Sequence, residues 1–251
     1  MRISLPVVLA ICLLTAAPSE GRQSLTRVSY LSGSDTVTAV LACPTGPGPF
    51  PALILIHEWY GLTDWVRDNA KLFADSGYIA LAIDLYRGRV AADPEEAHEL
   101  MRGLPEDRAA RDLAAAAGFL RDRKDVIGSR VGSVGWCMGG GYSLMAALRD
   151  PRLAGSVICY GRLVTDTTAL RALAVPLLGL FGGDDRGITP KDVNNFSTLA
   201  RSLGKSVETR IYPGAGHAFM NPTGKEAYRP AAAADAWTRI MAFFRQHLKD
   251  R

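Results

Sequence analysis

The sequence predicts an α/β protein with a mostly parallel sheet and helices on both faces. Residues 52–56 and 78–83 are unbroken apolar runs of strand length, as expected of strands that are covered on both sides. Segments with helical spacing alternate with such runs along the chain, which is typical of a parallel sheet. The chain has 251 residues, of which 48% are hydrophobic, and this is enough to bury the core of one such domain.

The predicted elements follow one another without an internal repeat or linker. Strands are expected at residues 26–31, 36–43, 52–56, 78–83, 130–134, 153–160, 176–181 and 207–212. Helices are expected at residues 63–76, 93–101, 106–123, 142–149, 190–203 and 231–248. The turn cluster 32–35 predicts an opening hairpin, and the Pro- and Gly-rich segment 44–51 predicts a loop. We therefore expect a single domain over residues 22–251.

Residues 1–21 have the pattern of a secretory signal peptide. Arg2 supplies a positive charge, the apolar stretch 5–14 follows, and small residues end the segment. The apolar stretch is too short to span a bilayer. We expect cleavage between Ala17 and Gly21, and export to the periplasm or the medium. The alternatives are an irregular start or a short membrane anchor, and an unprocessed chain would be cytoplasmic.

Charge and cysteine content limit the function classes. The formal net charge of +4 is spread along the chain without a basic block, so no nucleic-acid-binding pattern is present. Export would leave three cysteines, Cys43, Cys137 and Cys159, and an odd number leaves at least one free thiol in an oxidising compartment. Cys43 and Cys159 each end a strand-like run, and we expect both to be buried and reduced, although spacing alone leaves their pairing open.

The segment 135–140, Gly-Trp-Cys-Met-Gly-Gly, lies between a predicted strand and a predicted helix. Glycines two residues before and after Cys137 permit the sharp strand-to-helix turn called a nucleophile elbow, here with Cys where Ser is commoner. The first amides of the following helix would favour a thiolate and a developing oxyanion. The alternative is a buried, inert cysteine, so the interpretation requires a base and an acid elsewhere.

Two later predicted strands end in loops that supply these groups. Residues 182–185 read Gly-Gly-Asp-Asp, and residues 214–219 contain His217. The chain order nucleophile, acid, histidine is that of α/β-hydrolases. His217 would accept the thiol proton and later activate water, with a carboxylate fixing its tautomer. Asp184 and Asp185 compete for the acid role, because adjacent side chains at a strand end point opposite ways.

The loop after the third predicted strand contributes further candidates. Glu58 stands beside the expected oxyanion site, where its charge opposes an oxyanion unless it is paired or turned aside. The backbone amides of Trp59 and Met138 are the expected oxyanion donors, while the Trp59 indole either lines the pocket or packs in the core. The remaining histidines are weaker bases, one in a loop and two on helix faces: His57, His98 and His247.

Five motifs, taken in order, resemble the dienelactone hydrolase family. They are His-Glu-Trp-Tyr-Gly at 57–61, Asp-Leu-Tyr at 84–86, Gly-Trp-Cys-Met-Gly-Gly at 135–140, Gly-Gly-Asp-Asp at 182–185 and Pro-Gly-Ala-Gly-His-Ala-Phe at 213–219. The resemblance covers residues 28–248. It implies a monomeric α/β-hydrolase with a Cys-His-Asp triad and no metal or cofactor, which opens the enol-lactone ring of dienelactones to maleylacetate. It also implies that Asp185 is the triad acid, and that Glu58 holds the resting thiol until substrate arrives.

This chain departs from that family at two points. Members that act on dienelactone carry an arginine just after the Leu-Tyr pair, which grips the substrate carboxylate. Here Tyr86 is followed by Arg87, Gly88 and Arg89, so arginines flank the matching position. Tyr86, Arg87 and Arg89 are thus the candidate substrate-binding residues. Export is the second departure, because intermediates of aromatic-ring degradation are usually handled in the cytoplasm.

The expected function is hydrolysis of a lactone or small ester through a thioester at Cys137. The alternatives are hydrolysis of thioesters or peptide bonds by the same triad, and a non-catalytic binding module on the same scaffold. The expected partner is a small-molecule substrate, with no nucleic acid and no stable membrane association after processing.

Overall fold

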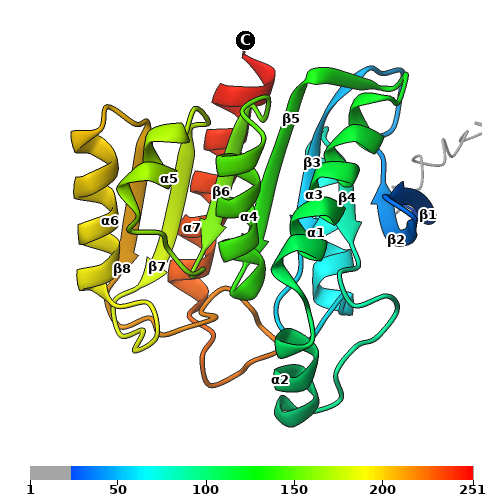
Figure 1. The fold of residues 1–251 in the computed structure, drawn as a ribbon. Helices are drawn as coiled ribbons and strands as arrows, with labels where there is room; N and C mark the ends of the chain where they lie inside the picture. Colours follow the sequence, from blue (N-terminus) through cyan, green and yellow to red (C-terminus); the bar gives the residue numbers. More distant parts are fainter. Residues whose placement is uncertain (1–23, 251) are drawn as a thin grey trace, which may run out of the picture.

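The computed structural model of the protein contains an eight-stranded sheet with helices on both faces (Figure 1). The structure describes residues 24–250, so the predicted signal peptide, residues 1–21, lies outside the described residues. The strands are β1 (Leu25–Ser32), β2 (Asp35–Ala42), β3 (Phe50–Ile56), β4 (Ile79–Ile83), β5 (Val126–Trp136), β6 (Gly155–Cys159), β7 (Leu177–Gly182) and β8 (Val207–Tyr212). The helices are α1 (Asp64–Asp75), α2 (Pro94–Arg102), α3 (Glu106–Arg121), α4 (Met138–Arg149), α5 (Thr167–Ala172), α6 (Pro190–Ser202), α7 (Pro230–Phe244) and the π-helical turn η1 (Arg245–Lys249).

The strand order is β1-β2-β4-β3-β5-β6-β7-β8. β2 pairs antiparallel with β1 and β4, whereas all neighbours from β4 to β8 are parallel. The predicted opening hairpin and the predicted mostly parallel sheet are both confirmed. Parallel strands bring their carboxyl ends to one edge, and ligands of open α/β sheets bind at that edge.

Two apolar layers cover the sheet, as β3 illustrates. Ile54 and Ile56 belong to the layer beneath α3, α4 and α6, while Leu53 and Leu55 face the layer beneath α1 and α7. Successive side chains of a strand point to opposite faces, so a strand buried on both faces must be apolar at every position. Figure 1 shows α7 behind the sheet and α3, α4 and α6 in front of it.

Three features of the fold differ from the predicted elements. α5 has six residues, with Asp166 accepting a hydrogen bond from the Thr168 amide, and it is too short to produce helical periodicity. β5 starts at Val126, four residues before the predicted strand 130–134. The last helix changes to π-helical geometry at Arg245. Within residues 24–250, no helix has the length and apolar character to cross a membrane.

Candidate active site

Cys137 occupies the turn between β5 and α4, at the carboxyl edge of the sheet. Its φ of 55° is left-handed, a costly conformation for a residue other than glycine, which functional sites often hold. The neighbouring glycines make the turn possible: a Cβ on Gly135 would overlap the Gly139 carbonyl, and a Cβ on Gly139 would overlap the Ile56 carbonyl oxygen. The sequence therefore forms the predicted elbow, with the loop after β3 packed against it.

Three buried serines hold α4 on the sheet beneath the elbow. The Ser133 hydroxyl on β5 lies 2.8 Å from the hydroxyls of Ser143 on α4 and Ser156 on β6. All three are buried, so their mutual hydrogen bonds satisfy groups that would otherwise be costly to bury. This cluster was not predicted from the sequence.

The structure brings Cys137, His217 and Asp185 together in one line of hydrogen bonds. Nε2 of His217 lies 3.1 Å from Sγ of Cys137, and Nδ1 lies 2.7 Å from Oδ2 of Asp185. The other oxygen, Oδ1, accepts hydrogen bonds from the amides of Gly187 and Ile188. An acceptor on Nδ1 fixes the proton there and leaves Nε2 to exchange a proton with the thiol.

The electrostatics of this line favour a charged histidine. Burial opposes the imidazolium, but hydrogen bonds to Asp185 and Cys137 outweigh it and raise the pKa of His217 to about 10. For Asp185, burial is likewise outweighed, because bonds from His217 and two amides lower its pKa. At neutral pH His217 is therefore an imidazolium, and its Nε2 faces the sulfur of Cys137.

The structure distinguishes the two candidate acids. Asp185 is buried and bonded to His217, whereas the Asp184 side chain is exposed. The Asp184 amide donates to the Ala215 carbonyl, which ties the loop after β7 to the loop after β8. The two neighbouring side chains thus point in opposite directions, as the sequence predicts.

Glu58 is buried beside the triad, but its partners differ from the prediction. Oε2 accepts a 2.6 Å hydrogen bond from Nδ2 of Asn221, and Oε1 accepts a 3.3 Å bond from the Tyr160 hydroxyl. The thiol hydrogen bond goes to His217 instead, so the implied resting contact between Glu58 and the thiol is corrected. Two neutral donors already satisfy both oxygens of this carboxylate.

Burial raises the pKa of Glu58 to about 7, although Asn221, His217 and Tyr160 act in the opposite direction. Glu58 therefore changes charge near neutral pH. In its protonated form it does not repel an oxyanion, so the repulsion expected from the sequence is absent below this pH. Tyr160 and Asn221 were missed in the sequence. Asn221 stands four residues after His217 in the same loop, and this proximity is the only signal that could have identified it.

His57 has a structural role at this edge. Its Nε2 accepts a hydrogen bond from the Leu85 amide, and its Nδ1 lies 2.6 Å from the Glu58 carbonyl oxygen. These two contacts assign the proton to Nδ1, and complete burial lowers the pKa of this histidine. His57 thus joins the ends of β3 and β4.

The candidate oxyanion donors come from the two segments that meet at the elbow. Met138 is the first residue of α4, so its N–H is one of the helix's unsatisfied first-turn donors. Trp59 follows Glu58 in the loop that contacts Gly139 through the Ile56 and His57 carbonyls. The Trp59 ring packs edge-on against Tyr60 and against His98 of α2, with centroids 5.2 and 4.7 Å apart.

The three candidate substrate-binding residues separate in the structure. Tyr86 is buried beside the nucleophile, with its hydroxyl 3.2 Å from Sδ of Met138. Arg87 forms a 2.8 Å ion pair with buried Asp112 of α3, and Arg89 forms a 2.9 Å pair with Glu96 of α2. The expected grip on a substrate by Arg87 is thus corrected, because its charge is already neutralised by a carboxylate on α3.

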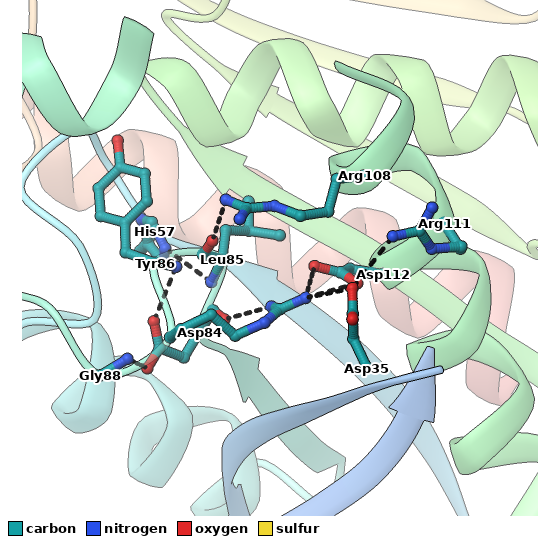
Figure 2. A network of polar contacts seen from close by, with 10 residues as sticks. Asp35, His57, Asp84, Leu85, Tyr86, Gly88, Arg108, Arg111 and Asp112 are labelled. Carbon is teal, nitrogen blue, oxygen red and sulfur yellow. Dashed lines mark hydrogen bonds and ion pairs between the residues drawn. The ribbon is translucent and has the colours of Figure 1, made fainter. Parts of the chain in front are cut away.

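Asp84 explains how Tyr86 is aimed. One oxygen of Asp84 accepts from the Tyr86 amide and the other from the Gly88 amide, as Figure 2 shows. The loop bends sharply here, with φ of 58° at Arg87 and 94° at Gly88. The carboxylate therefore holds a turn whose backbone is strained at Arg87, and Tyr86 lies in this turn.

The other two cysteines of the described chain are both free. Cys159 is fully buried and Cys43 half-buried, and burial raises the pKa of each thiol. Cys159 also supports the elbow, because its carbonyl accepts a 3.0 Å hydrogen bond from the Cys137 amide. Within residues 24–250, no cluster of three or more His, Cys, Asp or Glu side chains is placed to hold a metal ion.

Comparison with known proteins shows which family the chain belongs to. Residues 37–248 match the Dienelactone hydrolase family. A putative carboxymethylenebutenolidase of Methylorubrum extorquens is 32% identical, over 84% of this chain and 77% of the relative. A probable 2-oxo-3-(5-oxofuran-2-ylidene)propanoate lactonase of Bradyrhizobium is 32% identical, over 84% of this chain and 89% of the relative.

Solved structures agree as well. The crystal structure of a putative dienelactone hydrolase from Klebsiella pneumoniae has a TM-score of 0.81 and 28% identity, and covers 89% of this chain and 98% of its own. The match to the family runs from β2 to η1. The chain therefore belongs to the dienelactone hydrolase family and has the α/β-hydrolase fold.

Proposed function

We propose that this protein hydrolyses a lactone or small carboxylic ester through a thioester at Cys137. The observation that carries the proposal is the continuous line from Sγ of Cys137 to Nε2 of His217 at 3.1 Å and from Nδ1 to Asp185 at 2.7 Å. Nucleophile, base and orienting acid within hydrogen-bond reach form the arrangement that acyl transfer requires. A binding module would have no use for this alignment.

In the acylation step, the Cys137 thiolate attacks the carbonyl carbon of the substrate. The carbonyl oxygen becomes an oxyanion, which the amides of Met138 and Trp59 would stabilise. The carbon–oxygen bond to the alcohol then breaks, and the His217 imidazolium gives its proton to the departing alkoxide. For a lactone this alcohol stays attached to the acyl group, so the ring opens.

In the deacylation step, neutral His217 accepts a proton from water, whose oxygen attacks the thioester carbon. The second oxyanion would occupy the same amide site, and its collapse releases the carboxylic acid and returns the thiolate beside the imidazolium. Asp185 keeps Nδ1 protonated throughout, so Nε2 is the only ring nitrogen that exchanges protons. Glu58 assists in its neutral form, which predominates below its pKa of about 7.

The names of the relatives support this substrate class. One relative is described as a putative carboxymethylenebutenolidase and another as a probable lactonase. The particular lactone or ester of this chain is left open, because the two arginines expected to grip a carboxylate are paired with Asp112 and Glu96.

The test compares hydrolysis of a dienelactone and of p-nitrophenyl acetate by the wild type and by Cys137→Ala. We expect turnover by the wild type, none by the variant, and an acetylated Cys137 trapped by rapid acid quench and detected by mass spectrometry. Turnover that survives in Cys137→Ala would reject the mechanism. Turnover of the plain ester alone would reject dienelactone as a substrate.

Thiol labelling gives an independent test of the nucleophile. Iodoacetamide should modify Cys137 much faster than Cys43 or Cys159, because only Cys137 has a histidine partner. The His217→Gln variant should remove this advantage. Equal, slow labelling of all three cysteines would favour a binding module.

We also propose that the mature protein is exported. The proposal rests on the charged start, apolar stretch and small residues of segment 1–21. Cell fractionation of the full chain should place activity in the periplasm or medium, and a chain lacking residues 1–21 should remain in the cytoplasm. Cytoplasmic activity of the full chain would contradict the proposal.

A further inference from the structure

The peptide unit between Glu58 and Trp59 carries one of the two candidate oxyanion donors, the Trp59 N–H. Within residues 24–250, neither this N–H nor that of Met138 donates a hydrogen bond. Both groups are thus left unused by the fold, and both belong to the segments that meet at the elbow. Because a donor stabilises an oxyanion only when it is aimed at that oxygen, the orientation of this peptide unit matters for acyl transfer.

The Glu58 carbonyl, at the other end of the same peptide unit, is held by two groups. Nδ1 of His57 lies 2.6 Å from the carbonyl oxygen, and the Gly61 amide donates a 3.1 Å hydrogen bond to it. The bond from Gly61 closes a β-turn. The peptide unit is trans, so its N–H and C=O point in opposite directions. Whatever holds the carbonyl therefore also sets the direction of the Trp59 N–H.

The donor at Nδ1 is itself fixed from a second loop. Nε2 of His57 accepts a 3.2 Å hydrogen bond from the Leu85 amide, drawn in Figure 2, so the proton of the neutral ring lies on Nδ1. His57 is fully buried, and burial lowers its pKa, which keeps the ring neutral. The Tyr86 ring packs against the imidazole, with 4.8 Å between centroids. The loop after β4 therefore decides which nitrogen donates to the Glu58 carbonyl.

We propose that His57 is a positioning residue for the oxyanion site, and that its Nδ1–H aims the Trp59 amide by holding the Glu58 carbonyl. The inference rests on the proposed hydrolase function and adds a residue to its machinery. His57 acts through this peptide unit and takes no part in proton transfer. Its loss should therefore slow reactions that form an oxyanion and spare those that do not.

The experiment compares two reactions of Cys137. Hydrolysis of p-nitrophenyl acetate passes through an oxyanion, whereas iodoacetamide loses iodide from a saturated carbon and forms none. His57→Gln keeps a carbonyl oxygen near the position of Nε2 for the Leu85 amide, but it has no donor at the position of Nδ1.

Loss of a whole oxyanion donor costs about 10²- to 10³-fold in kcat. In His57→Gln the bond from Gly61 remains, so the Trp59 N–H is misaligned and not removed. We therefore expect kcat for the ester to fall about 10- to 100-fold, while alkylation of Cys137 stays within about twofold of the wild type.

His57→Asn is the conservative variant, because its side-chain NH₂ takes the position of Nδ1 and donates to the Glu58 carbonyl. It should restore most of the lost kcat, although it has no acceptor for the Leu85 amide. His98→Gln is the matched control, since His98 contacts the ring of Trp59, with 4.7 Å between centroids. This change leaves the bond to the Glu58 carbonyl in place and should alter neither reaction.

Two results would overturn the inference and leave the hydrolase function intact. One is an equal loss of hydrolysis and alkylation in His57→Gln, which would indicate general damage to the site. The other is an equal loss of kcat in His57→Gln and His57→Asn. If the wild type is alkylated at Cys137 but hydrolyses no ester or lactone, the hydrolase function itself fails.

A measurement on the wild type covers the case in which the His57 variants do not fold. Heteronuclear NMR of protein with isotope-labelled histidine shows which ring nitrogen of His57 carries the proton. We expect the proton on Nδ1 and a free lone pair on Nε2 at neutral pH. Nδ1 without a proton would leave the Glu58 carbonyl without this donor, and the inference would be wrong.

Discussion

Asn221 donates a 2.6 Å hydrogen bond to Glu58, although the two residues lie 163 positions apart in the chain. The bond joins the loop after β8, which also carries His217, to the loop after β3, which carries Trp59. Tyr160, after β6, holds the second oxygen of the same carboxylate. Glu58 is thus held by donors from two separate loops, and both donors lower its pKa.

Replacing Asn221 should move the ionisation of Glu58. The bond from Asn221 lowers the pKa of Glu58 against the larger effect of burial, so Asn221→Ala should raise that pKa further. Because ionised Glu58 opposes the oxyanion, kcat/KM of the wild type should fall as the pH rises through about 7. In Asn221→Ala this fall should occur at higher pH.

The exposed Asn195 of α6 offers a control, and Asn195→Ala should leave the profile unchanged. In the double variant Glu58→Gln/Asn221→Ala, kcat/KM should no longer fall as the pH rises through this range. A shift to lower pH in Asn221→Ala would show that the bond does not favour the charged form of Glu58.

Glu58 should also make the protein less stable at alkaline pH. Its pKa is about 7 in the folded protein and about 4.3 in an unfolded chain. Above pH 4.3 the unfolded state gives up this proton more readily than the folded state, so stability falls until the pH passes about 7. Glu58→Gln removes this loss and keeps partners for Asn221 and Tyr160.

Urea denaturation should therefore show Glu58→Gln and the wild type nearly equal at pH 4. At pH 8 the variant should be more stable by about 3 kcal/mol. An advantage of the same size at both pH values would assign the effect to packing and not to ionisation.

The main features of the fold could be predicted because each has a local signature. Residues 207–212 were predicted with the bounds that β8 shows, and residues 52–56 fall inside β3. Such runs reveal burial on both faces directly. α5 was missed because six residues cannot display a helical period, and its cap at Asp166 resembles any loop aspartate.

The site residues that a local motif marks could be predicted from the sequence. The hydrogen-bond and ion-pair partners that are remote in sequence could not. Cys137 is marked by the glycines that its turn needs, and His217 by its loop after a strand. The partners of Glu58 and Arg87 depend on side chains from remote loops and helices, such as Asn221 and Asp112. No sequence spacing encodes these contacts, so Glu58 and Arg87 received roles that the packing does not support.

Asp185 and Asp184 provide a neighbouring pair for testing the triad. Asp185→Asn keeps an acceptor for the Gly187 and Ile188 amides but loses the charge that orients His217. We expect kcat to fall about 10³- to 10⁴-fold, as for a similar change in a serine protease triad. Asp184→Asn, at an exposed position, should stay within about twofold. Equal losses in both variants would contradict the assignment.

Gly139 in the elbow and Gly141 in the following helix should differ sharply in their tolerance of a methyl group. A Cβ on Gly139 would overlap the Ile56 carbonyl, which belongs to a central strand and cannot move. Gly139→Ala should cost more than about 3 kcal/mol or prevent folding, because overpacking adds to backbone displacement. Gly141 lies in the same helix, and its nearest neighbours would be 3.4 Å from a Cβ. Gly141→Ala should stay within about 1 kcal/mol of the wild type in denaturant unfolding, since alanine favours helix.

The ion pair of Arg87 should contribute to stability and not to substrate selection. Asp112 is fully buried and Arg87 about three-quarters so, with their atoms 2.8 Å apart. Arg87→Met would strand a buried carboxylate, and we expect a loss of about 3 kcal/mol in urea unfolding. Arg89→Met breaks an exposed pair with Glu96 and should cost less than about 1 kcal/mol. If Arg87→Met instead keeps the stability of the wild type, the ion pair with Asp112 does not stabilise the fold.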